Sequence, residues 1–507
     1  MEGNRGSLYE YISSAVVDGQ LPRDFSLPQE AEDNRIRWTD GALDGVSIFH
    51  MGVQSMKEQE TGLMEEAVAA ASQGDMEEAE RLFVSLGQKV RAIHAIDALQ
   101  SYILENKDTL SAANLYRYGI SAAAESSDRE CVKFGLSILE LFNTDDDDVR
   151  AVIKTLGLSD EFSIFAVFIM RDWKDGNDQI YDLARKIHGW GRIHAIEHLE
   201  PETEEIRQWL LREGVHNAVL PAYSALECWT KGRGAEALEG DLSREDFSGI
   251  RDIIAGLLDE APCPGISRIE NGYGQIAAFL HRAKDMELNL EDYEAVRSVK
   301  ISCEDKNPDI ARQCESLLNS EKCKNFVRQA VKRGEGVELA RDLNVDYKDD
   351  ILKVMRAEFD RNYGLCGYLM DDPALRTEVL DIFREHVPLD EMKAQPTDSL
   401  GMGEEFKKHI PLELILQGLR DCPLEGAEFV ETALQCSPVR IRNYGLGVLE
   451  NWVAVRELPL EQLLPSAFRL LGRLRETEVN RTTAERMGKL LEWETVFDQT
   501  RPGAVSG

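Results

Sequence analysis

Apolar residues recur at three- and four-residue steps along most of the chain, which is the spacing of one face of an α-helix. The pattern is clear over residues 63–71 and again over 79–86, with the turn sequence Ser-Gln-Gly-Asp at 72–75 between them. Similar turn signals stand at 143–145, 174–177, 232–234 and 262–265. No alternating run persists long enough to predict a central β-strand. The pattern therefore predicts an all-α protein.

Two helix starts carry a clear signal. Asp147-Asp148-Val149-Arg150 places acidic residues in a first helical turn, where the N-terminal partial positive charge favours them, and Asn307-Pro308-Asp309 adds a proline that a first turn tolerates. The most apolar stretch, Phe162 to Met170, is too short to cross a bilayer as a helix. We expect it to form a buried core helix.

Three pairs of segments repeat one another. Ile-His-Ala-Ile-Asp-Ala-Leu at 93–99 matches Ile-His-Ala-Ile-Glu-His-Leu at 193–199, and Gly-Trp-Gly-Arg-Ile at 189–193 matches Gly-Tyr-Gly-Gln-Ile at 272–276. Phe-Gly-Leu-Ser-Ile-Leu-Glu at 134–140 matches Tyr-Gly-Leu-Gly-Val-Leu-Glu at 444–450. Because the spacings are irregular, these echoes predict degenerate HEAT-like helix pairs that stack into a curved solenoid.

The repeats and the composition of the intervening segments predict five regions along the chain. Residues 1–55 form a non-repetitive N-terminal segment rich in Pro, Asp and Gly, and 56–385 form the helical-repeat array. A connection interrupted by Pro and Met spans 386–410, a C-terminal helical group spans 411–498, and 499–507 form a frayed tail.

Composition narrows the classes of function. With 43% hydrophobic and 30% charged residues the chain can build a sizeable core. The 92 acidic and 58 basic residues give a net charge of −34, which disfavours nucleic acid and anionic membranes as partners. Nine scattered cysteines without a C-x-x-C pair disfavour a disulfide framework or a structural zinc site. No signal peptide is evident, and we expect a soluble cytoplasmic protein.

One short motif has the spacing of a metal site. His194-Ala-Ile-Glu197-His198 matches the H-x-x-E-H pattern of inverted zinc peptidases, in which two histidines on one helix face bind zinc and the glutamate acts as base. The same stretch is a repeat element, however, and its echo at 94–98 lacks the second histidine. A motif inherited from a repeat indicates packing, so we predict no metal site.

Three Gly-x-Gly elements, at 189–191, 232–234 and 272–274, resemble part of a dinucleotide-binding fingerprint. That fingerprint needs a preceding strand and a β-α-β unit, whereas the residues before these glycines have a helical pattern. We therefore predict turns between helices in which glycine relieves a constraint on φ.

The sequence around Cys422 and Cys436 does not suit a haem thiolate, and neither a G-x-S-x-G elbow nor a P-loop occurs. The large aromatic residues predicted to lie in the core or between repeats are Trp173, Trp190, Trp209, Trp229 and Trp452.

Two segments resemble a known family. Trp-Thr-Asp-Gly-Ala-Leu-Asp-Gly at 38–45 with Phe-His-Met-Gly at 49–52, together with His-Gly-Trp-Gly-Arg-Ile-His-Ala-Ile-Glu at 188–197, is similar to helical-repeat proteins of Firmicutes that carry the name limonene hydroxylase. The resemblance implies an oxidoreductase that uses a nicotinamide cofactor, NAD(P)H. It would hydroxylate limonene to carveol or perillyl alcohol and oxidise these alcohols to carvone or perillyl aldehyde.

Two hypotheses from different classes follow. Insertion of oxygen into an allylic C–H bond needs a metal or a flavin, and the sequence offers no recognisable haem, flavin or metal site, so no catalytic or cofactor-binding residue is assigned. The alternative is a non-catalytic helical-repeat scaffold that binds a protein partner on its concave face.

Overall fold

The computed structural model describes residues 6–28, 38–52 and 56–492. These residues form 29 α-helices and several short π- and 3₁₀-helical turns, with no β-strand among them. Only two isolated bridges occur in the described ranges, Val17–Gln20 and Lys393–Cys436. The all-α prediction is confirmed. The tail predicted over 499–507 lies outside the described residues.

The chain divides between Leu317 and Leu318 into two compact units. Unit 1 comprises residues 1–317 and unit 2 comprises 318–507. The division falls inside the segment 56–385, for which the sequence predicts one array.

Unit 1 begins with a helix and a short helical segment that precede the main series of helices. Its elements are α1 (Leu8–Ala15), α2 (Ala42–Val46), the π-turn η1 (Ser47–Met51), α3 (Glu58–Gln73), α4 (Met76–Gly87), α5 (Ala92–Glu105), α6 (Ala112–Glu125), α7 (Arg129–Leu139), α8 (Asp147–Gly157), α9 (Ser163–Met170), α10 (Gly176–Lys186), α11 (Trp190–His198), α12 (Glu204–Trp209), η2 (Leu210–Gly214), α13 (Ala222–Lys231), α14 (Gly234–Glu239), α15 (Arg244–Leu258), η3 (Ile266–Arg268), α16 (Gly272–Ala283), α17 (Leu290–Cys303) and α18 (Pro308–Leu318), the last of which ends at the division.

Side-chain caps explain where several of these helices begin. Asp128 accepts a hydrogen bond from the backbone N–H of Cys131 at 2.8 Å and so caps α7, and Asp146 caps α8 in the same way. Such caps satisfy N–H groups that have no partner within the helix. The two helix starts predicted from sequence, at Asp147 and Pro308, are confirmed.

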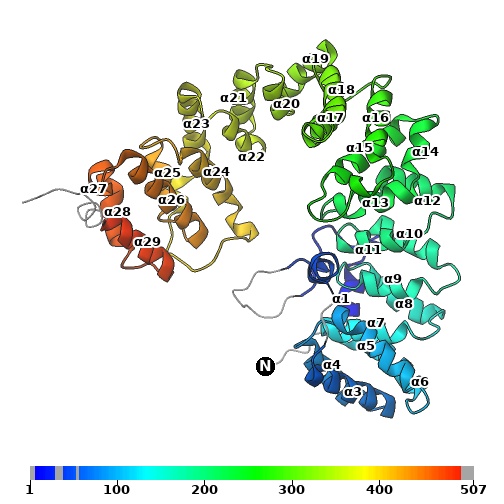
Figure 1. Ribbon diagram of the computed structural model, residues 1–507. Coiled ribbons are helices and arrows are strands. Elements are labelled where there is room, and N and C mark those ends of the chain that lie inside the picture. Colours follow the sequence, from blue (N-terminus) through cyan, green and yellow to red (C-terminus); the bar gives the residue numbers. More distant parts are fainter. Residues whose placement is uncertain (1–5, 29–37, 53–55, 493–507) are drawn as a thin grey trace, which may run out of the picture. The chain divides into compact units, whose positions relative to one another are not determined.

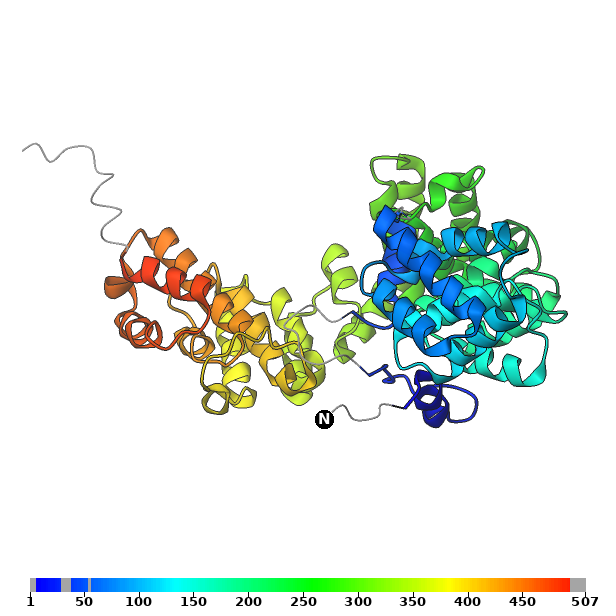
Figure 2. The ribbon, with the colours of Figure 1, turned by 90° about the horizontal axis from the view of Figure 1, so that it is seen from below.

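Neighbouring helices of unit 1 pack against one another in chain order, as the progression from blue to green shows (Figure 1). Phe83 of α4 contacts both Tyr118 of α6 and Phe134 of α7, with ring centroids 5.2 Å apart in each pair. α9 is the predicted core helix, and seven of its eight residues are buried. α1 packs on α6 and α8, and the second view shows it as a dark blue helix at the side of this series (Figure 2).

Unit 2 contains the remaining helices. They are α19 (Glu321–Ala330), η4 (Val331–Arg333), α20 (Val337–Asp342), α21 (Lys348–Ala357), α22 (Phe359–Asn362), η5 (Tyr363–Tyr368), α23 (Pro373–His386), η6 (Leu389–Met392), η7 (Glu404–His409), α24 (Ile410–Leu419), α25 (Ala427–Ala433), α26 (Val439–Arg456), α27 (Leu460–Leu463), α28 (Pro465–Leu474) and α29 (Arg481–Leu491). Between α23 and α24 the chain makes only the short 3₁₀ turns η6 and η7.

Unit 2 has its own core around Trp452, whose ring is fully buried and whose Nε1–H donates to the carbonyl of Leu419 at 2.8 Å. Arg442 is also buried there and makes two hydrogen bonds to the carboxylate of Glu478, at 2.6 and 2.7 Å.

The predicted positions of the tryptophans are largely confirmed, because four of the five are buried. The fifth, Trp209, packs between neighbouring helices. It is partly exposed and lies between the ring of Tyr181 and the guanidinium of Arg192.

All nine cysteines belong to the described ranges, and none forms a disulfide. None of the described helices is both long and apolar enough to cross a membrane.

Candidate functional site

The two segments that carry the family resemblance contact each other in unit 1. α2 and η1, which contain most of the first segment, lie on the start of α11, which contains most of the second. A Cβ atom on Gly45 would stand 2.1 Å from the ring of Trp190, so only glycine allows this approach. Phe49 continues the contact, with its ring centroid 6.0 Å from that of Trp190 and 4.9 Å from that of Tyr223 in α13. We call residues 38–51 the docked segment.

A turn of the chain before α9 holds the other side of the docked segment. Gly41 has a φ of +74°, and its N–H donates to Oε2 of Glu161 at 2.8 Å. A Cβ on Gly41 would stand 2.4 Å from the carbonyl oxygen of Asp160. Both the backbone conformation and the close approach therefore require glycine at this position.

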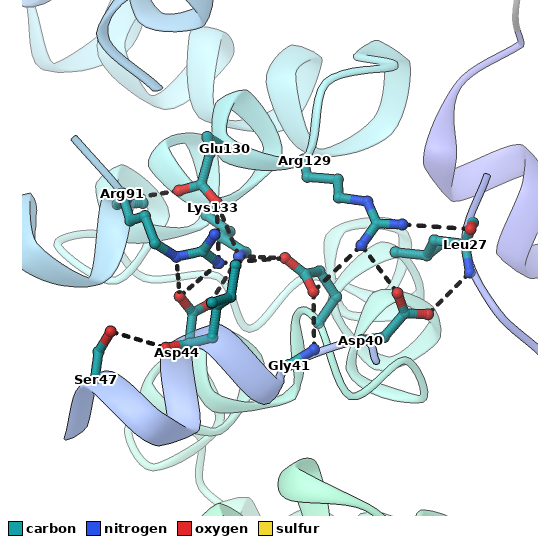
Figure 3. A network of polar contacts seen from close by, with 12 residues as sticks. Leu27, Asp40, Gly41, Asp44, Ser47, Arg91, Arg129, Glu130 and Lys133 are labelled. Carbon is teal, nitrogen blue, oxygen red and sulfur yellow. Dashed lines mark hydrogen bonds and ion pairs between the residues drawn. The ribbon is translucent and has the colours of Figure 1, made fainter. Parts of the chain in front are cut away.

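Lys133 lies at the centre of a network of charged side chains beneath the docked segment (Figure 3). Its side chain has no exposed surface, and Nζ donates to Asp44 of the docked segment at 2.7 Å and to Glu130 at 3.1 Å. Nζ also donates to Glu161, through a short hydrogen bond. Burial acts to lower the pKa of Lys133, but the three carboxylates outweigh it and raise the pKa above its ordinary value. The three carboxylates therefore favour the charged form of Lys133.

Asp44 is the counterpart of Lys133 on the docked segment. Burial acts to raise the pKa of Asp44, but Lys133 and Arg91 together lower it below its ordinary value. Arg91 donates to Asp44 from Nε at 2.8 Å and lies 3.3 Å from Glu130. Glu130 also accepts the N–H of Ala92 at 2.6 Å, so it caps the start of α5 while it binds the two cations.

Arg129 binds a second acidic residue of the docked segment. Its Nη1 donates to Oδ1 of Asp40 at 2.9 Å and lies 3.5 Å from Glu161. Its Nη2 donates to the carbonyls of Leu27 and Pro28, at 3.3 and 3.2 Å. Both aspartates of the docked segment are thus bound by cations of the helices that follow it, as Figure 3 shows.

Asp160 connects this network to α11. Its Oδ1 accepts the N–H of Gly191 at 2.7 Å, in the first turn of α11. Burial raises the pKa of Asp160 to about 6, and the nearby Asp40 and Glu161 add to the increase, although hydrogen bonds from Gly191 and Gly189 oppose it. The carboxylate of Asp160 thus occupies the position where the turn at 189–191 leads into α11.

This placement decides whether the turn at 189–191 suits the pyrophosphate of a nicotinamide cofactor. A Cβ on Gly189 would stand 2.2 Å from Oδ2 of Asp160, so the carboxylate fills the space that a phosphate would need. A second negative charge in contact with Asp160 would also be repelled. The residues of this turn do not fit a dinucleotide.

Two of the three Gly-x-Gly elements begin in a turn between helices, as predicted, and lead into α11 and α14, whereas residues 272–274 already lie inside α16. The predicted reason was wrong, because none of their glycines has a positive φ. Close packing explains them instead: a Cβ would come within 2.5 Å of the ring of Trp229 at Gly234 and of the carbonyl of Ile266 at Gly272.

The H-x-x-E-H stretch forms part of the same contact region. His194 is 1% exposed and its ring lies against those of Phe49 and Trp190, whereas the ring of His198 contacts Phe168. Neither ring nitrogen of His194 has a hydrogen-bond partner, and Nδ1 lies 3.8 Å from the carboxylate of Glu197. Within the described ranges no three His, Cys, Asp or Glu side chains are grouped so that they could hold a metal ion.

A cavity of about 980 Å³ opens beside the charged network. Its wall comes from α1, from the docked segment, and from the chain around the starts of α5 and α7. Trp38 and Tyr11 contribute exposed rings, with 48% and 43% of their surface accessible. Arg91 and Arg129 also line it. A second cavity, of about 430 Å³, lies on the side of Asp160 and His188, and Trp38 and Thr39 line both.

The sequence did not predict the network. One signal was available: Lys133 stands inside a run from Cys131 to Leu139 in which every residue is buried. A lysine on the apolar face of a helix requires a buried carboxylate, but the sequence does not show which one.

No protein-family model matches the chain, and no curated protein matches it either.

Proposed function

We propose that this protein is a non-catalytic helical-repeat scaffold that binds a protein partner in the 980 Å³ cavity of unit 1. The observation that carries the proposal is that the docked segment and the repeat helices build this cavity together, with Trp38, Thr39 and Leu43 facing residues of α1 and of the starts of α5 and α7. Of the H-x-x-E-H residues, His194 packs against Phe49 of the docked segment, whereas His198 packs against Phe168.

The proposal includes a degenerate HEAT-like array as the underlying architecture. The echo between residues 134–140 and 444–450 supports it, because the two glycines have the same environment in their own units. A Cβ on Gly135 would meet the Cβ of Ala122 in the preceding helix at 2.7 Å, and a Cβ on Gly445 would meet that of Ala433 at 3.1 Å. A helix pair that repeats the same glycine-to-alanine contact is what inherited repeats predict.

The chemistry of the cavity also bears on the monoterpene hypothesis. Six charged side chains belong to its wall: Glu10, Arg91, Asp128, Arg129, Glu130 and Glu161. A hydrocarbon such as limonene would remove water from the exposed parts of these groups without offering a hydrogen bond in return, which costs free energy. Monoterpene oxidation stays a prediction from the sequence resemblance.

One assay discriminates the two hypotheses. We expect the purified full-length protein to show no NADH-dependent turnover of limonene, and no flavin, haem or stoichiometric metal by absorbance and elemental analysis. Saturable turnover that follows the protein through purification would overturn the scaffold proposal. Elemental analysis of the double variant His194→Ala and His198→Ala, compared with the wild type, tests the zinc motif separately, and we expect equal zinc in both.

Partner binding is tested by placing a photo-crosslinking amino acid at Trp38 and, as a control, at Leu104, which is 55% exposed and outside the cavity. In the native host we expect one discrete protein adduct from position 38 and none from position 104. Equal labelling from the two positions would count against the cavity as the binding site.

A further inference from the structure

We propose that the partner segment in the 980 Å³ cavity is basic, and that an arginine or lysine side chain of the partner lies between the exposed aromatic rings and the acidic wall. This inference rests on the proposed function and identifies the chemistry of the partner.

The charges on the wall favour a cation over an anion. Four carboxylates, those of Glu10, Asp128, Glu130 and Glu161, face two cations, Arg91 and Arg129. Both cations are already engaged. Arg91 is bound by Asp44 at 2.7 Å and by Glu130 at 3.3 Å, and Arg129 by Asp40 at 2.9 Å and by Glu161 at 3.5 Å. An anionic ligand would have to displace a buried carboxylate, whereas a cationic one meets four carboxylates that Arg91, Arg129 and the Lys133 behind them leave one charge short of neutral.

The network behind the wall is also negative, but by one charge rather than two, and it shares Arg91, Arg129, Glu130 and Glu161 with the wall. Its three cations are Arg91, Arg129 and Lys133, and its four carboxylates are Asp40, Asp44, Glu130 and Glu161. Charges in such a weakly solvated region interact more strongly than charges in water. A ligand cation at the cavity wall would offset the net negative charge of the network. Its binding is therefore also favoured by Asp40 and Asp44, which belong to the network but do not line the cavity.

The aromatic rings supply the second half of the site. Trp38 and Tyr11 line the cavity and are each a little under half exposed, although aromatic residues of this size are on average well buried. Tyr11 is held in place, because its ring packs against that of Phe25, with the ring centroids 5.7 Å apart, and its hydroxyl donates to the carbonyl of Ser26. A guanidinium or ammonium group is attracted to the face of such a ring, and to tryptophan most strongly.

The net charge of −34 acts over a longer range. It attracts a basic segment toward the molecule as a whole and speeds its association. The same attraction makes any basic peptide bind weakly and non-specifically, so the test has to separate the cavity from the general field.

The test uses two fluorescein-labelled peptides, acetyl-(Gly-Arg)₄-amide and acetyl-(Gly-Glu)₄-amide, and measures fluorescence anisotropy with the full-length protein. We expect the arginine peptide to bind saturably with one peptide per chain and the glutamate peptide not to bind. Trp38→Ala should weaken binding about fivefold or more, because the ring face is lost, while Trp38→Phe should retain most of it.

Two charge reversals complete the test. Glu10→Lys changes the cavity wall, and Glu65→Lys changes another exposed acid, in α3, that lies outside the cavity. We expect Glu10→Lys to weaken binding of the arginine peptide several-fold more than Glu65→Lys does. Equal effects of the two reversals, no binding of the arginine peptide, or binding of the glutamate peptide that Trp38→Ala weakens would each overturn the basic partner. Limonene turnover, measured separately, would overturn the proposed function whatever the peptides do.

Discussion

Lys133 is fully buried, and its Nζ is held by carboxylates from three different parts of the chain. At the scale of single residues, charge compensation of this kind determines whether the region under the docked segment is stable. A buried cation is tolerated because Asp44, Glu130 and Glu161 surround it, and each carboxylate is tolerated because the cation is present. Removal of either side leaves an uncompensated buried charge on the other.

Lys133→Met tests this balance. The methionine fills a similar volume but leaves Asp44 and Glu161 without their central cation, so we expect the free energy of unfolding of unit 1 to fall by about 3–5 kcal/mol. Denaturant unfolding of the variant and the wild type measures the change. Arg81→Met, which breaks the exposed pair with Glu78, is the control and should shift the midpoint very little. An effect of Lys133→Met no larger than this control would contradict the central role of the network.

Asp160→Asn tests the pKa of Asp160. Because the folded protein raises this pKa to about 6 from an ordinary value of 3.8, the folded state holds the proton more tightly than the unfolded state does. The stabilising contribution of Asp160 is therefore fully present below about pH 4 and is lost as the pH rises through 6. Asparagine does not titrate. We expect the stability of the variant relative to the wild type to improve between pH 4 and pH 7, as measured by urea unfolding at both pH values.

This comparison removes most other titrations, since they are common to both proteins. Asparagine also removes the repulsion of Asp160 by Asp40 and Glu161, which raises the pKa of Asp160 in the wild type. A relative stability that does not change with pH would show that the folded protein leaves the pKa of Asp160 near 3.8.

At the scale of elements, the docked segment is held by contacts that differ in kind. Asp40 and Asp44 bind cations, Gly41 binds Glu161, and Gly45 and Phe49 pack on Trp190. The polar contacts hold α2 against α7 and the turn before α9, and the aromatic contacts pack the docked segment against α11. The segment can therefore be loosened by steric change alone, without any change of charge.

Gly45→Ala makes such a steric change. The new Cβ would stand 2.1 Å from Cε3 of Trp190, so either α2 or the indole ring must move, and we expect a loss of about 1–3 kcal/mol in the free energy of unfolding. We also expect faster proteolysis within residues 38–52. Gly62→Ala in α3 is a matched control, because no atom lies within 4 Å of its Cβ position, and there alanine should stabilise the helix by about 0.5–1 kcal/mol. Equal destabilisation by both substitutions would argue against close packing at Gly45.

At the scale of the whole molecule, the chain forms two units with separate cores. The network of Lys133 belongs entirely to unit 1, and the buried pair of Arg442 and Glu478 belongs to unit 2. A core that is disrupted in one unit should therefore lower protection mainly in that unit.

Hydrogen exchange of the full-length protein tests this separation. In Lys133→Met we expect faster exchange among the helices of residues 56–317 and little change beyond residue 318. In Arg442→Met, which leaves Glu478 unpaired, we expect the reverse. Loss of protection throughout the chain in either variant would show that the two units unfold as one.

The candidate site could be predicted only in part. The segments 38–45 and 188–197 stand out in the sequence, and each proved to belong to the site. Their roles could not be predicted, because a short motif such as His194-Ala-Ile-Glu197-His198 has the same spacing whether it binds a metal or packs against Phe49. The partners of Asp44 and Gly41 lie 89 and 120 residues away, and nothing local indicates them.

The sequence by itself determined the all-α class, the buried helix α9 and the starts of α8 and α18, because apolar spacing and first-turn chemistry act over a few residues. The tertiary structure alone decided that Lys133 is buried among carboxylates, that Asp160 fills the turn at Gly189 and that the docked segment borders a cavity. These features depend on groups brought together across long separations in the chain, where burial and electrostatic compensation, rather than local preference, determine which contacts form.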